Sequence, residues 1–338
     1  MVTTGNSCTV ALKSDGTVWA WGNLIELGFY DKQPVNTHKK PIQISGIDNS
    51  IAFAVGAMHF VVLKSDGTVW AQGSNNQGQL GYGTFFWSLG MDHVQGLTDI
   101  IAIAAEGNRT VALKSDGTVW GWGDNSNHQF GDGGSYPYKT PVQITGLENI
   151  VAIETSAKNL FAVKSDGTVW ILGEYYNEQY GWTWTYDNFP VQITGLTGIT
   201  SIAASTWHTV ALKSDGTVWA CYQSGSGQLS DGITEHNKFT QVINLSDICA
   251  IAVGWGHTIA LKSDGTVWAW GRIDDTNNYQ YTPVQIPELT DVIAISTGFM
   301  HTVCIKANGT AWAWGRNSSG QLGDGSTKNH SAPVQVKK

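Results

Sequence analysis

The chain has 338 residues, of which 41% are hydrophobic and only 14% are charged, against about 25% charged in an ordinary globular domain. Its 19 basic and 27 acidic residues give a net charge of −8, and no basic run is longer than two residues. Nucleic acid is therefore excluded as a partner, because binding to its phosphates requires clustered lysine and arginine. No apolar run reaches the roughly 18 residues that membrane insertion requires, and the N-terminus lacks the features of a signal peptide. We expect either a cytoplasmic protein or a secreted one whose signal has been removed.

One seven-residue motif recurs along the whole chain. Lys-Ser-Asp-Gly-Thr-Val-Trp occurs six times and Lys-Ala-Asn-Gly-Thr-Ala-Trp once, and the copies begin at Lys13, Lys64, Lys114, Lys164, Lys213, Lys262 and Lys306. Successive motif tryptophans are 51, 50, 50, 49, 49 and 44 residues apart. Repeats of about this length indicate a solenoid, a propeller or an array. Because seven copies fill residues 1–338, the sequence predicts a single domain.

Each repeat contains four short strand patterns, called A to D. In the third repeat, strand A covers residues 101–105, strand B 110–114, strand C 118–123 and strand D 141–144. The Asp-Gly pair between B and C, flanked by apolar runs, is a strong hairpin signal, and no helical period appears. Four antiparallel strands per blade, repeated seven times, predict an all-β fold, the seven-bladed β-propeller.

The two ends of the chain suggest how such a propeller closes. The chain begins with strands A, B and C of one unit and ends on an isolated strand D, Pro333-Val334-Gln335-Val336. We therefore expect the C-terminal strand, residues 333–336, to join the N-terminal blade. This arrangement would remove free sheet edges and tie the two termini together.

The motif tryptophans are predicted to be packing residues. All seven first tryptophans recur with the repeat, and four repeats carry a second tryptophan two residues later, namely Trp21, Trp122, Trp270 and Trp314. Strands that are buried on both faces read as nearly continuous apolar runs. These tryptophans are therefore assigned to the core between blades and not to a ligand site.

Four histidines occupy equivalent places just before strand B: His59, His208, His257 and His301. Equivalent positions on packed sheets lie about 10 Å apart, whereas zinc needs its nitrogen ligands at about 2.0–2.1 Å. A repeated structural hydrogen bond is therefore expected in place of a metal site. The common motifs of serine nucleophiles, zinc proteases and phosphate loops are also missing from the sequence. We accordingly expect no metal, no cofactor and no enzyme activity.

The A–B turns and C–D loops lie on one face of the predicted propeller, and they carry the variable residues. The repeated Lys-Ser-Asp-Gly-Thr turn on the opposite face is most simply scaffold, whereas variable loops on a rigid frame are where binding residues are usually found. Turn tips are normally polar, but several A–B tips are apolar: Met58, Trp207, Trp255, Phe299 and Met300. They either form an exposed interaction patch or fold inward and plug the central channel.

The C–D loops supply a second set of aromatic candidates. Phe86 and Trp87 in the second repeat, and Trp182 and Trp184 in the fourth, replace the polar loop of the seventh repeat. Such side chains either stack on a sugar or anchor a protein partner, or they pack against a neighbouring loop.

The order of these motifs resembles the regulator of chromosome condensation repeat. The seventh repeat shows it in residues 312–315 (Trp-Ala-Trp-Gly), 317–325 (Asn-Ser-Ser-Gly-Gln-Leu-Gly-Asp-Gly) and 333–335 (Pro-Val-Gln). The resemblance covers the whole chain and implies a seven-bladed propeller. The near-identical copies of Lys-Ser-Asp-Gly-Thr-Val-Trp resemble those of bacterial members of the family.

The resemblance also implies functions that can be compared with the residues. A small-GTPase exchange factor of this family uses a β-wedge inserted in one blade, and its chromatin binding needs a basic surface, whereas no repeat spacing here exceeds 51 residues and the chain is acidic. A UV-B photoreceptor of the family uses Gly-Trp-Arg-His-Thr turns, and the match at residues 254–258 has Gly256 in place of the arginine. A bacterial β-lactamase inhibitor with similar repeats binds its enzyme through one propeller face, a mode that this sequence does not contradict.

These observations favour a non-catalytic scaffold that binds a protein partner through the face of the A–B turns and C–D loops. The alternative is a lectin that binds carbohydrate through the loop aromatics. GTPase exchange and UV-B photoreception rest on family analogy alone, and the sequence favours them less than the scaffold or the lectin.

Overall fold

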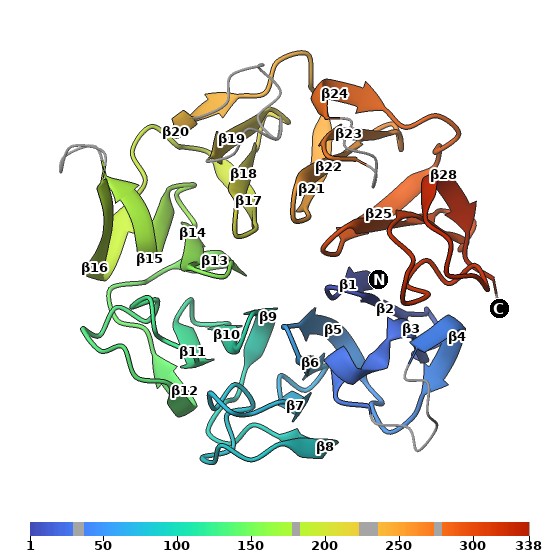
Figure 1. Cartoon of the computed structure of the whole chain (residues 1–338). Helices are drawn as coiled ribbons and strands as arrows, with labels where there is room; N and C mark the ends of the chain where they lie inside the picture. Colours follow the sequence, from blue (N-terminus) through green and yellow to red (C-terminus); the bar gives the residue numbers. More distant parts are fainter. Residues whose placement is uncertain (30–36, 178–182, 223–235, 274–278, 338) are drawn as a thin grey trace. The chain divides into compact units, whose positions relative to one another are not determined.

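The computed structural model describes residues 1–29, 37–177, 183–222, 236–273 and 279–337, and it contains seven four-stranded antiparallel sheets (Figure 1). Within each sheet the strands follow one another in chain order. The sheets are the blades of a seven-bladed β-propeller, which confirms the fold predicted from the repeats. Blades are numbered 1 to 7 in chain order.

The strand bounds follow the repeat closely. Blade 1 contains β1 (Val2–Thr4), β2 (Cys8–Leu12), β3 (Val18–Asn23) and β4 (Thr37–Ile44), with the short 3-10 helix η1 (Leu24–Leu27) after β3. Blades 2, 3 and 4 contain β5 (Ser50–Val55), β6 (His59–Lys64), β7 (Val69–Gly73), β8 (Ser88–His93), β9 (Ile100–Glu106), β10 (Arg109–Lys114), β11 (Val119–Gly123), β12 (Tyr138–Gln143), β13 (Ile150–Thr155), β14 (Asn159–Lys164), β15 (Val169–Asn177) and β16 (Thr183–Gln192). Blades 5, 6 and 7 contain β17 (Ile199–Ala204), β18 (His208–Lys213), β19 (Val218–Tyr222), β20 (His236–Gln241), β21 (Ile248–Val253), β22 (His257–Lys262), β23 (Val267–Gly271), β24 (Gln280–Gln285), β25 (Val292–Thr297), β26 (His301–Lys306), β27 (Ala311–Gly315) and β28 (His330–Gln335).

The chain divides into two compact units. Unit 1 comprises Met1–Leu24, Tyr30–Ser45 and Ala203–Lys338, and unit 2 comprises Ile25–Phe29 and Gly46–Ile202. Unit 2 therefore holds blades 2, 3 and 4, and unit 1 holds blades 1, 6 and 7 with most of blade 5. That residues 1–338 form a single domain stays a prediction.

The predicted strand exchange between the last and first blades is wrong. β28 pairs with β27, so the strand that contains Pro333 completes its own blade. Blade 1 has its own fourth strand, because β4 pairs with β3 and places Gln43 opposite Trp19. The Pro-Ile-Gln-Ile segment at residues 41–44 is the strand D of the first repeat, so blade 1 has no strand missing.

Blades 1 and 7 meet through side chains within unit 1. β1 lies beside β25 (Figure 1), and Val2 is buried in one cluster with Val303 and Leu322. The indole Nε1 of Trp21 donates a hydrogen bond to the Gln321 carbonyl at 2.8 Å. The ends of the chain are thus joined by packing and hydrogen bonds between two complete blades.

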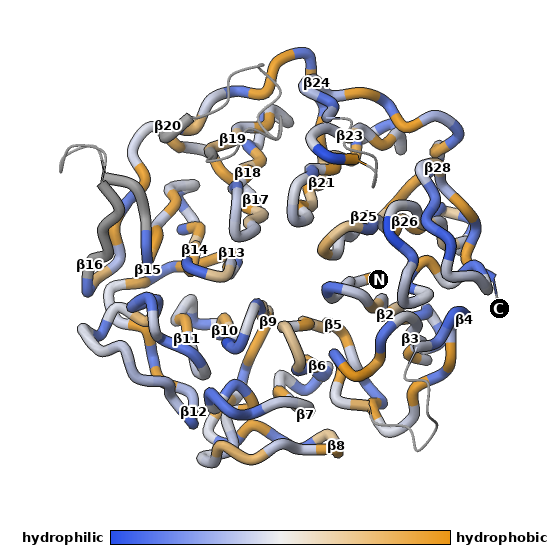
Figure 2. Tube along the Cα trace, in the orientation of Figure 1, coloured by the Kyte–Doolittle hydropathy of each residue, from blue (hydrophilic) through white to orange (hydrophobic). Residues whose placement is uncertain are grey.

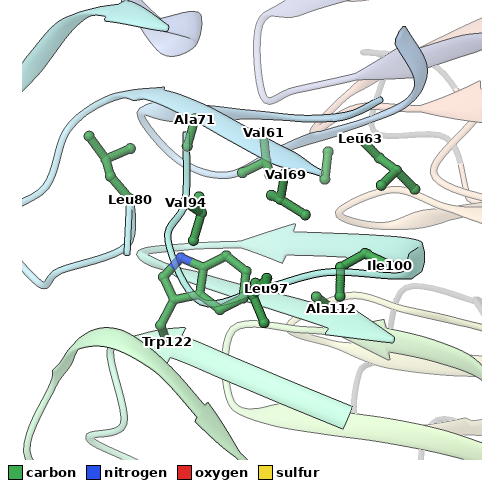
Figure 3. Packing of buried hydrophobic residues seen from close by; sticks show 11 residues of the cluster. Val61, Leu63, Val69, Ala71, Leu80, Val94, Leu97, Ile100, Ala112 and Trp122 are labelled. Atoms are coloured by element: carbon green, nitrogen blue, oxygen red, sulfur yellow. The ribbon is translucent and has the colours of Figure 1, made fainter. Parts of the chain in front are cut away.

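The second tryptophans of the repeats form the centres of these inter-blade clusters. Figure 2 shows hydrophobic and hydrophilic stretches mixed along the described strands. In the cluster shown in Figure 3, Trp122 of blade 3 lies among Leu80, Val94 and Leu97 of blade 2. Its Nε1 donates to the Gln79 carbonyl at 2.9 Å. The four second tryptophans are at most 2% exposed, which confirms their assignment to the core.

The first tryptophans of the repeats are half-buried and pack locally. The Nζ of Lys64, for example, lies 4.0 Å from the ring centroid of Trp70, in the range of a cation–π contact. The indole Nε1 of Trp70 donates to the Thr68 hydroxyl. The repeated motif therefore builds its own turn, in keeping with a scaffold role for that face.

The core of blade 3 contains an exchange of side-chain sizes. Gly121 stands where blade 2 has Ala71, and Phe130 stands where blade 2 has Leu80. A Cβ added to Gly121 would lie 2.5 Å from a ring carbon of Phe130. Because protein interiors are close-packed, the larger residue at position 130 requires the smaller one at position 121.

We expect Gly121→Ala to lower the free energy of unfolding by about 1–3 kcal/mol, the usual cost of overpacking a core. Phe130→Leu in the same chain should recover part of that loss, because it restores the pair of side chains found in blade 2. Urea unfolding of the two single variants and the double variant measures the coupling. Losses that simply add would contradict the steric explanation.

Candidate functional site

Four buried histidines directly follow A–B tips, His59 in unit 2 and the other three in unit 1. Each of the four repeated histidines starts the second strand of its blade, and its Nε2 lies within hydrogen-bond distance of a threonine hydroxyl of a neighbouring blade. The pairs are His59 with Thr110 at 2.9 Å, His208 with Thr258 at 2.8 Å, His257 with Thr302 at 3.1 Å and His301 with Thr9 at 3.2 Å. The repeated structural hydrogen bond expected from the sequence is confirmed.

Burial sets the charge of these histidines. All four are at most 4% exposed. Burial lowers the pKa of His59 and His257 to about 4. It lowers the pKa of His208 and His301 to about 3, with a smaller contribution from nearby His257. They are therefore neutral at pH 7 and form a polar but uncharged frame.

No metal site accompanies these histidines in the part of the chain that the structure describes. Nowhere among those residues do three or more His, Cys, Asp or Glu side chains come close enough to hold a metal ion. None of the described helices is long and apolar enough to cross a membrane.

Three adjoining A–B tips of unit 1 bring predicted aromatic residues together. Trp207 lies on the tip of blade 5, Trp255 on that of blade 6 and Phe299 on that of blade 7. The ring centroids of Trp207 and Trp255 are 6.4 Å apart and the rings are nearly perpendicular, at 87°. Those of Trp255 and Phe299 are 5.1 Å apart at 30°. Trp207, Trp255 and Phe299 are called the aromatic row.

Backbone hydrogen bonds hold the tips that carry the row. The tips of blades 5, 6 and 7 are each closed by a bond from the residue before the tip to the carbonyl of the histidine after it, at 2.8–2.9 Å. In addition, the N–H of Trp255 donates to the carbonyl of Phe299 at 3.0 Å, which joins the tips of blades 6 and 7. The row therefore stands on a backbone that is fixed without any ligand.

The row is partly exposed to solvent. Trp207 is 41% exposed and Phe299 37% exposed, and Trp255 between them is half-buried. Met300, beside Phe299 on the same tip, is also half-buried. Met58 lies on the blade 2 tip in unit 2, half-buried and outside the row.

The aromatic residues of the C–D loops divide into two cases. In blade 2, Phe86 is 79% exposed and Trp87 is 43% exposed, in the loop before β8 as predicted. In blade 4, Trp182 lies outside the described residues, and Trp184 belongs to β16, where it is paired with Tyr176 of β15. The assignment of Trp184 to a loop is therefore wrong. The alternating Thr-Trp-Thr-Tyr sequence at residues 183–186 favours a strand and lengthens the hairpin.

Two arginines beside the row were not among the sequence predictions. In blades 2, 3, 6 and 7 the residue that follows the third strand is tied by its backbone N–H to the carbonyl of its own A–B tip. Arg272 donates in this way to Gly256 at 2.7 Å, and Arg316 donates to Met300 at 2.8 Å. The sequence signal is the residue after the glycine of Trp-x-Trp-Gly, which differs from repeat to repeat.

Comparison with known proteins places the chain among proteins of the same repeat. An 84-residue segment is 37% identical to the E3 ubiquitin-protein ligase HERC2 of Homo sapiens, and it covers 24% of this chain and 2% of HERC2. A segment of the same length is 33% identical to the regulator of chromosome condensation of Mus musculus, and it covers 24% of this chain and 20% of that protein. The chain thus matches only a small part of the length of these relatives.

Solved structures with the same fold match nearly the whole chain. Prp20p from Saccharomyces cerevisiae superposes with a TM-score of 0.81 at 22% identity, covering 97% of this chain and 88% of Prp20p. Human WBSCR16 superposes with a TM-score of 0.80 at 19% identity, covering 95% and 94%. The family model of the RCC1-like domain matches residues 26–338. The chain therefore belongs to the RCC1-like domain family, as its repeated motifs indicate.

Proposed function

We propose that this propeller is a binding module that takes up a protein partner through the aromatic row, without catalysing a reaction on it. The observation that carries the proposal is the contact of Trp207, Trp255 and Phe299 on three adjoining tips, with two of them more than a third exposed. Tryptophan is enriched among the few residues that supply most of the energy of an interface. A fixed backbone lowers the entropy lost on binding.

The ring geometry favours a protein over a carbohydrate at this row. A sugar stacks on the open face of an aromatic ring. Trp255 has Phe299 packed at 30° beside it and Trp207 meeting it edge to face, so the rings form an irregular apolar surface and not a flat platform. Such a surface suits a side-chain anchor of a protein partner. The carbohydrate alternative then rests on Phe86 and Trp87 in the blade 2 loop.

The relatives support a role in binding. The structure of Prp20p was described together with its binding to Gsp1p and histones. Another structure shows yeast RCC1 (Prp20) bound to Kap60. Gsp1p, histones and Kap60 are partners of Prp20. For this chain, the kind of partner is inferred from the residues of its own aromatic row.

The aromatic row is tested by capture with matched variants. Three forms of the protein are immobilised on a support: the full chain, the row variant Trp207→Ala/Trp255→Ala/Phe299→Ala and the loop variant Phe85→Ala/Phe86→Ala/Trp87→Ala. Each is incubated with extract of the source organism, and the retained proteins are identified by mass spectrometry. The dissociation constant of the purified partner is then measured for each form by calorimetry. We expect the row variant to bind at least about 100-fold more weakly, since two interface hot spots are worth about 2 kcal/mol or more each. The loop variant should bind normally.

Two results would count against this proposal. One is binding that survives in the row variant and disappears in the loop variant. The other is a glycan-array signal that depends on Phe86 and Trp87 when no protein is captured, which would favour the lectin. Circular dichroism and thermal melting of each variant establish that a loss of binding is not a loss of folding.

A further inference from the structure

We propose that the aromatic row recognises an acidic protein segment, whose apolar side chain sits on the row while its carboxylates pair with Arg272 and Arg316. The inference rests on the proposed function and adds to it the chemistry of the partner. Its basis is the side chains next to the row.

The two arginines stand beside the two tips that carry Trp255 and Phe299. Arg272 is bonded through its backbone to Gly256, the neighbour of Trp255, and Arg316 is bonded to Met300, the neighbour of Phe299. These bonds, at 2.7 and 2.8 Å, fix where each side chain begins. Two arginine side chains therefore begin beside the tips that carry Trp255 and Phe299.

In blades 3 and 4 of unit 2 the same position carries an acid that already has a basic partner, whereas blade 2 has the uncharged Ser74 there. In blade 3 it holds Asp124, whose Oδ2 lies 3.7 Å from an amino nitrogen of Arg109. In blade 4 it holds Glu174, whose Oε2 lies 2.9 Å from the Nζ of Lys158. Where the residue at this position is an acid, its charge thus has a basic partner in the same unit.

For the two arginines, the described residues supply no such partner. Across the described ranges of the chain, neither Arg272 nor Arg316 has a carboxylate within ion-pair distance. The Nε of Arg316 donates only to the Ser318 hydroxyl, at 3.1 Å. Within the described part of the chain, the Nε of Arg272 is buried without a hydrogen-bond partner, and a buried donor left unpaired is costly. Among the described residues, then, neither guanidinium group has a carboxylate to neutralise its charge, and Arg316 is exposed.

The chemistry of that acceptor follows from arginine. The planar guanidinium matches the two oxygens of a carboxylate, and the adjoining row offers an apolar seat. A cationic ligand would be repelled by two positive charges. A long polyanion such as nucleic acid would meet a chain of net charge −8 with only two cations at the site, whereas its binding needs a track of them. A short acidic segment with an apolar anchor fits both features.

The experiment uses the full chain and three sets of short fluorescein-labelled peptides. Every peptide carries the same central Leu or Phe anchor, flanked by Asp and Glu in the first set, by Asn and Gln in the second and by Lys in the third. Binding is followed by fluorescence anisotropy. We expect the acidic peptides to bind at least about tenfold more tightly than the amide peptides, because one arginine–carboxylate pair of good geometry contributes about that factor to the affinity.

Variants then assign that preference to the arginines. Arg272→Gln/Arg316→Gln should remove it, and Arg272→Glu/Arg316→Glu should shift the preference to the lysine peptides. The control Lys39→Gln/Lys337→Gln removes the same charge from exposed positions of unit 1 and should leave the preference intact. Arg316→Gln alone, at an exposed residue, provides a second variant should the double change disturb folding.

The outcomes separate the inference from the proposed function. The inference is overturned if acidic and amide peptides bind equally, if no peptide binds, if the acidic preference survives Arg272→Gln/Arg316→Gln, or if single-stranded DNA displaces the peptides through the same arginines. If Trp207→Ala/Trp255→Ala/Phe299→Ala loses binding while the arginine variants bind normally, the result supports a protein-binding aromatic row and contradicts an acidic partner. Acidic peptides that bind the row variant as well as the unchanged chain would instead contradict the proposed function.

Discussion

Acidification is expected to unfold the protein between about pH 6.5 and pH 4, because four buried histidines are neutral in the folded state. Burial lowers the pKa of His59 and His257 to about 4, and of His208 and His301 to about 3, from the usual 6.5. In the unfolded chain these side chains take up protons near pH 6.5. Between the two sets of pKa values the unfolded state therefore binds more protons than the folded state.

The sign and size of the effect follow from that difference. Stability is at its full value above pH 6.5 and falls as the pH falls, until the folded-state pKa values are reached. Each histidine that is protonated only in the unfolded state costs about 1.4 kcal/mol per pH unit. Four of them cost about 5 kcal/mol per pH unit, against a typical total stability of about 5–15 kcal/mol. Unfolding should thus occur before the folded-state pKa values are reached.

Urea unfolding at a series of pH values from 8 down to 4.5 measures this dependence. The variant His208→Asn copies the asparagine that blade 4 carries at the equivalent place, Asn159. We expect it to be less stable at pH 8, since the bond to Thr258 is lost, but to have a shallower acid slope by about 1.4 kcal/mol per pH unit. A free energy of unfolding that stays constant from pH 7 to pH 5 would show that the histidines do not control acid stability.

The blades could be predicted from the sequence because each is built from local signals. The Lys-Ser-Asp-Gly-Thr turn forms within five residues: the Asp66 carboxylate accepts the backbone N–H and the hydroxyl of Thr68. The strands on either side of it pair directly through this turn. A repeat of such hairpins at a constant spacing predicts the fold without reference to contacts between distant residues. The structural role of the histidines followed equally from spacing alone.

Features that depend on a neighbouring blade were harder to predict. The position of Arg272 beside Trp255 depends on the backbone bond from Arg272 to Gly256 on the A–B tip, a contact that the order of residues along the chain does not reveal. The extension of β15 and β16 depends on pairing across the hairpin, between Tyr175–Asn177 and Thr183–Thr185. The predicted strand exchange is wrong for a local reason, since residues 41–44 already supply strand D of the first repeat.

The aromatic row shows the same division between local and distant information. The sequence places Trp207, Trp255 and Phe299 on equivalent turn tips, and this was enough to select them together. It did not determine whether they fold inward or meet one another at the surface. That depends on the backbone bond between Trp255 and Phe299 and on the rings' own contacts.

Arg109→Ala is expected to lower the free energy of unfolding by about 3–5 kcal/mol, the loss typical of removing one partner of a buried charged network. Arg109 occupies the histidine position in blade 3 and is 1% exposed. The position in blade 4 that faces it holds Leu160, where five of the other six blades have a threonine and blade 2 has Phe60. Its guanidinium instead donates to the carbonyls of Ser156 and Ala157, at 2.7 and 2.8 Å.

The charge of Arg109 survives burial. Burial lowers its pKa to about 10, and the opposing charges of Asp124 and Glu106 limit the fall, so it is protonated at pH 7. Alanine would leave the carbonyls of Ser156 and Ala157 without their donor. It would also remove the positive charge that opposes the effect of burial on Glu106, whose pKa burial raises.

A double variant tests whether the neighbouring blade dictates the residue at position 109. Arg109→His alone places an imidazole opposite Leu160, which cannot form a hydrogen bond. Arg109→His/Leu160→Thr recreates the pair that His59 forms with Thr110. We expect Leu160→Thr to destabilise both backgrounds, because Leu160 is fully buried, but to cost about 1 kcal/mol less in the Arg109→His background, the net value of a typical hydrogen bond. Unfolding in urea of all four forms gives the coupling energy. If Leu160→Thr destabilises both backgrounds equally, the histidine–threonine pair is not the unit that joins these blades. A favourable coupling would instead show that each blade's second strand selects the side chain its neighbour presents.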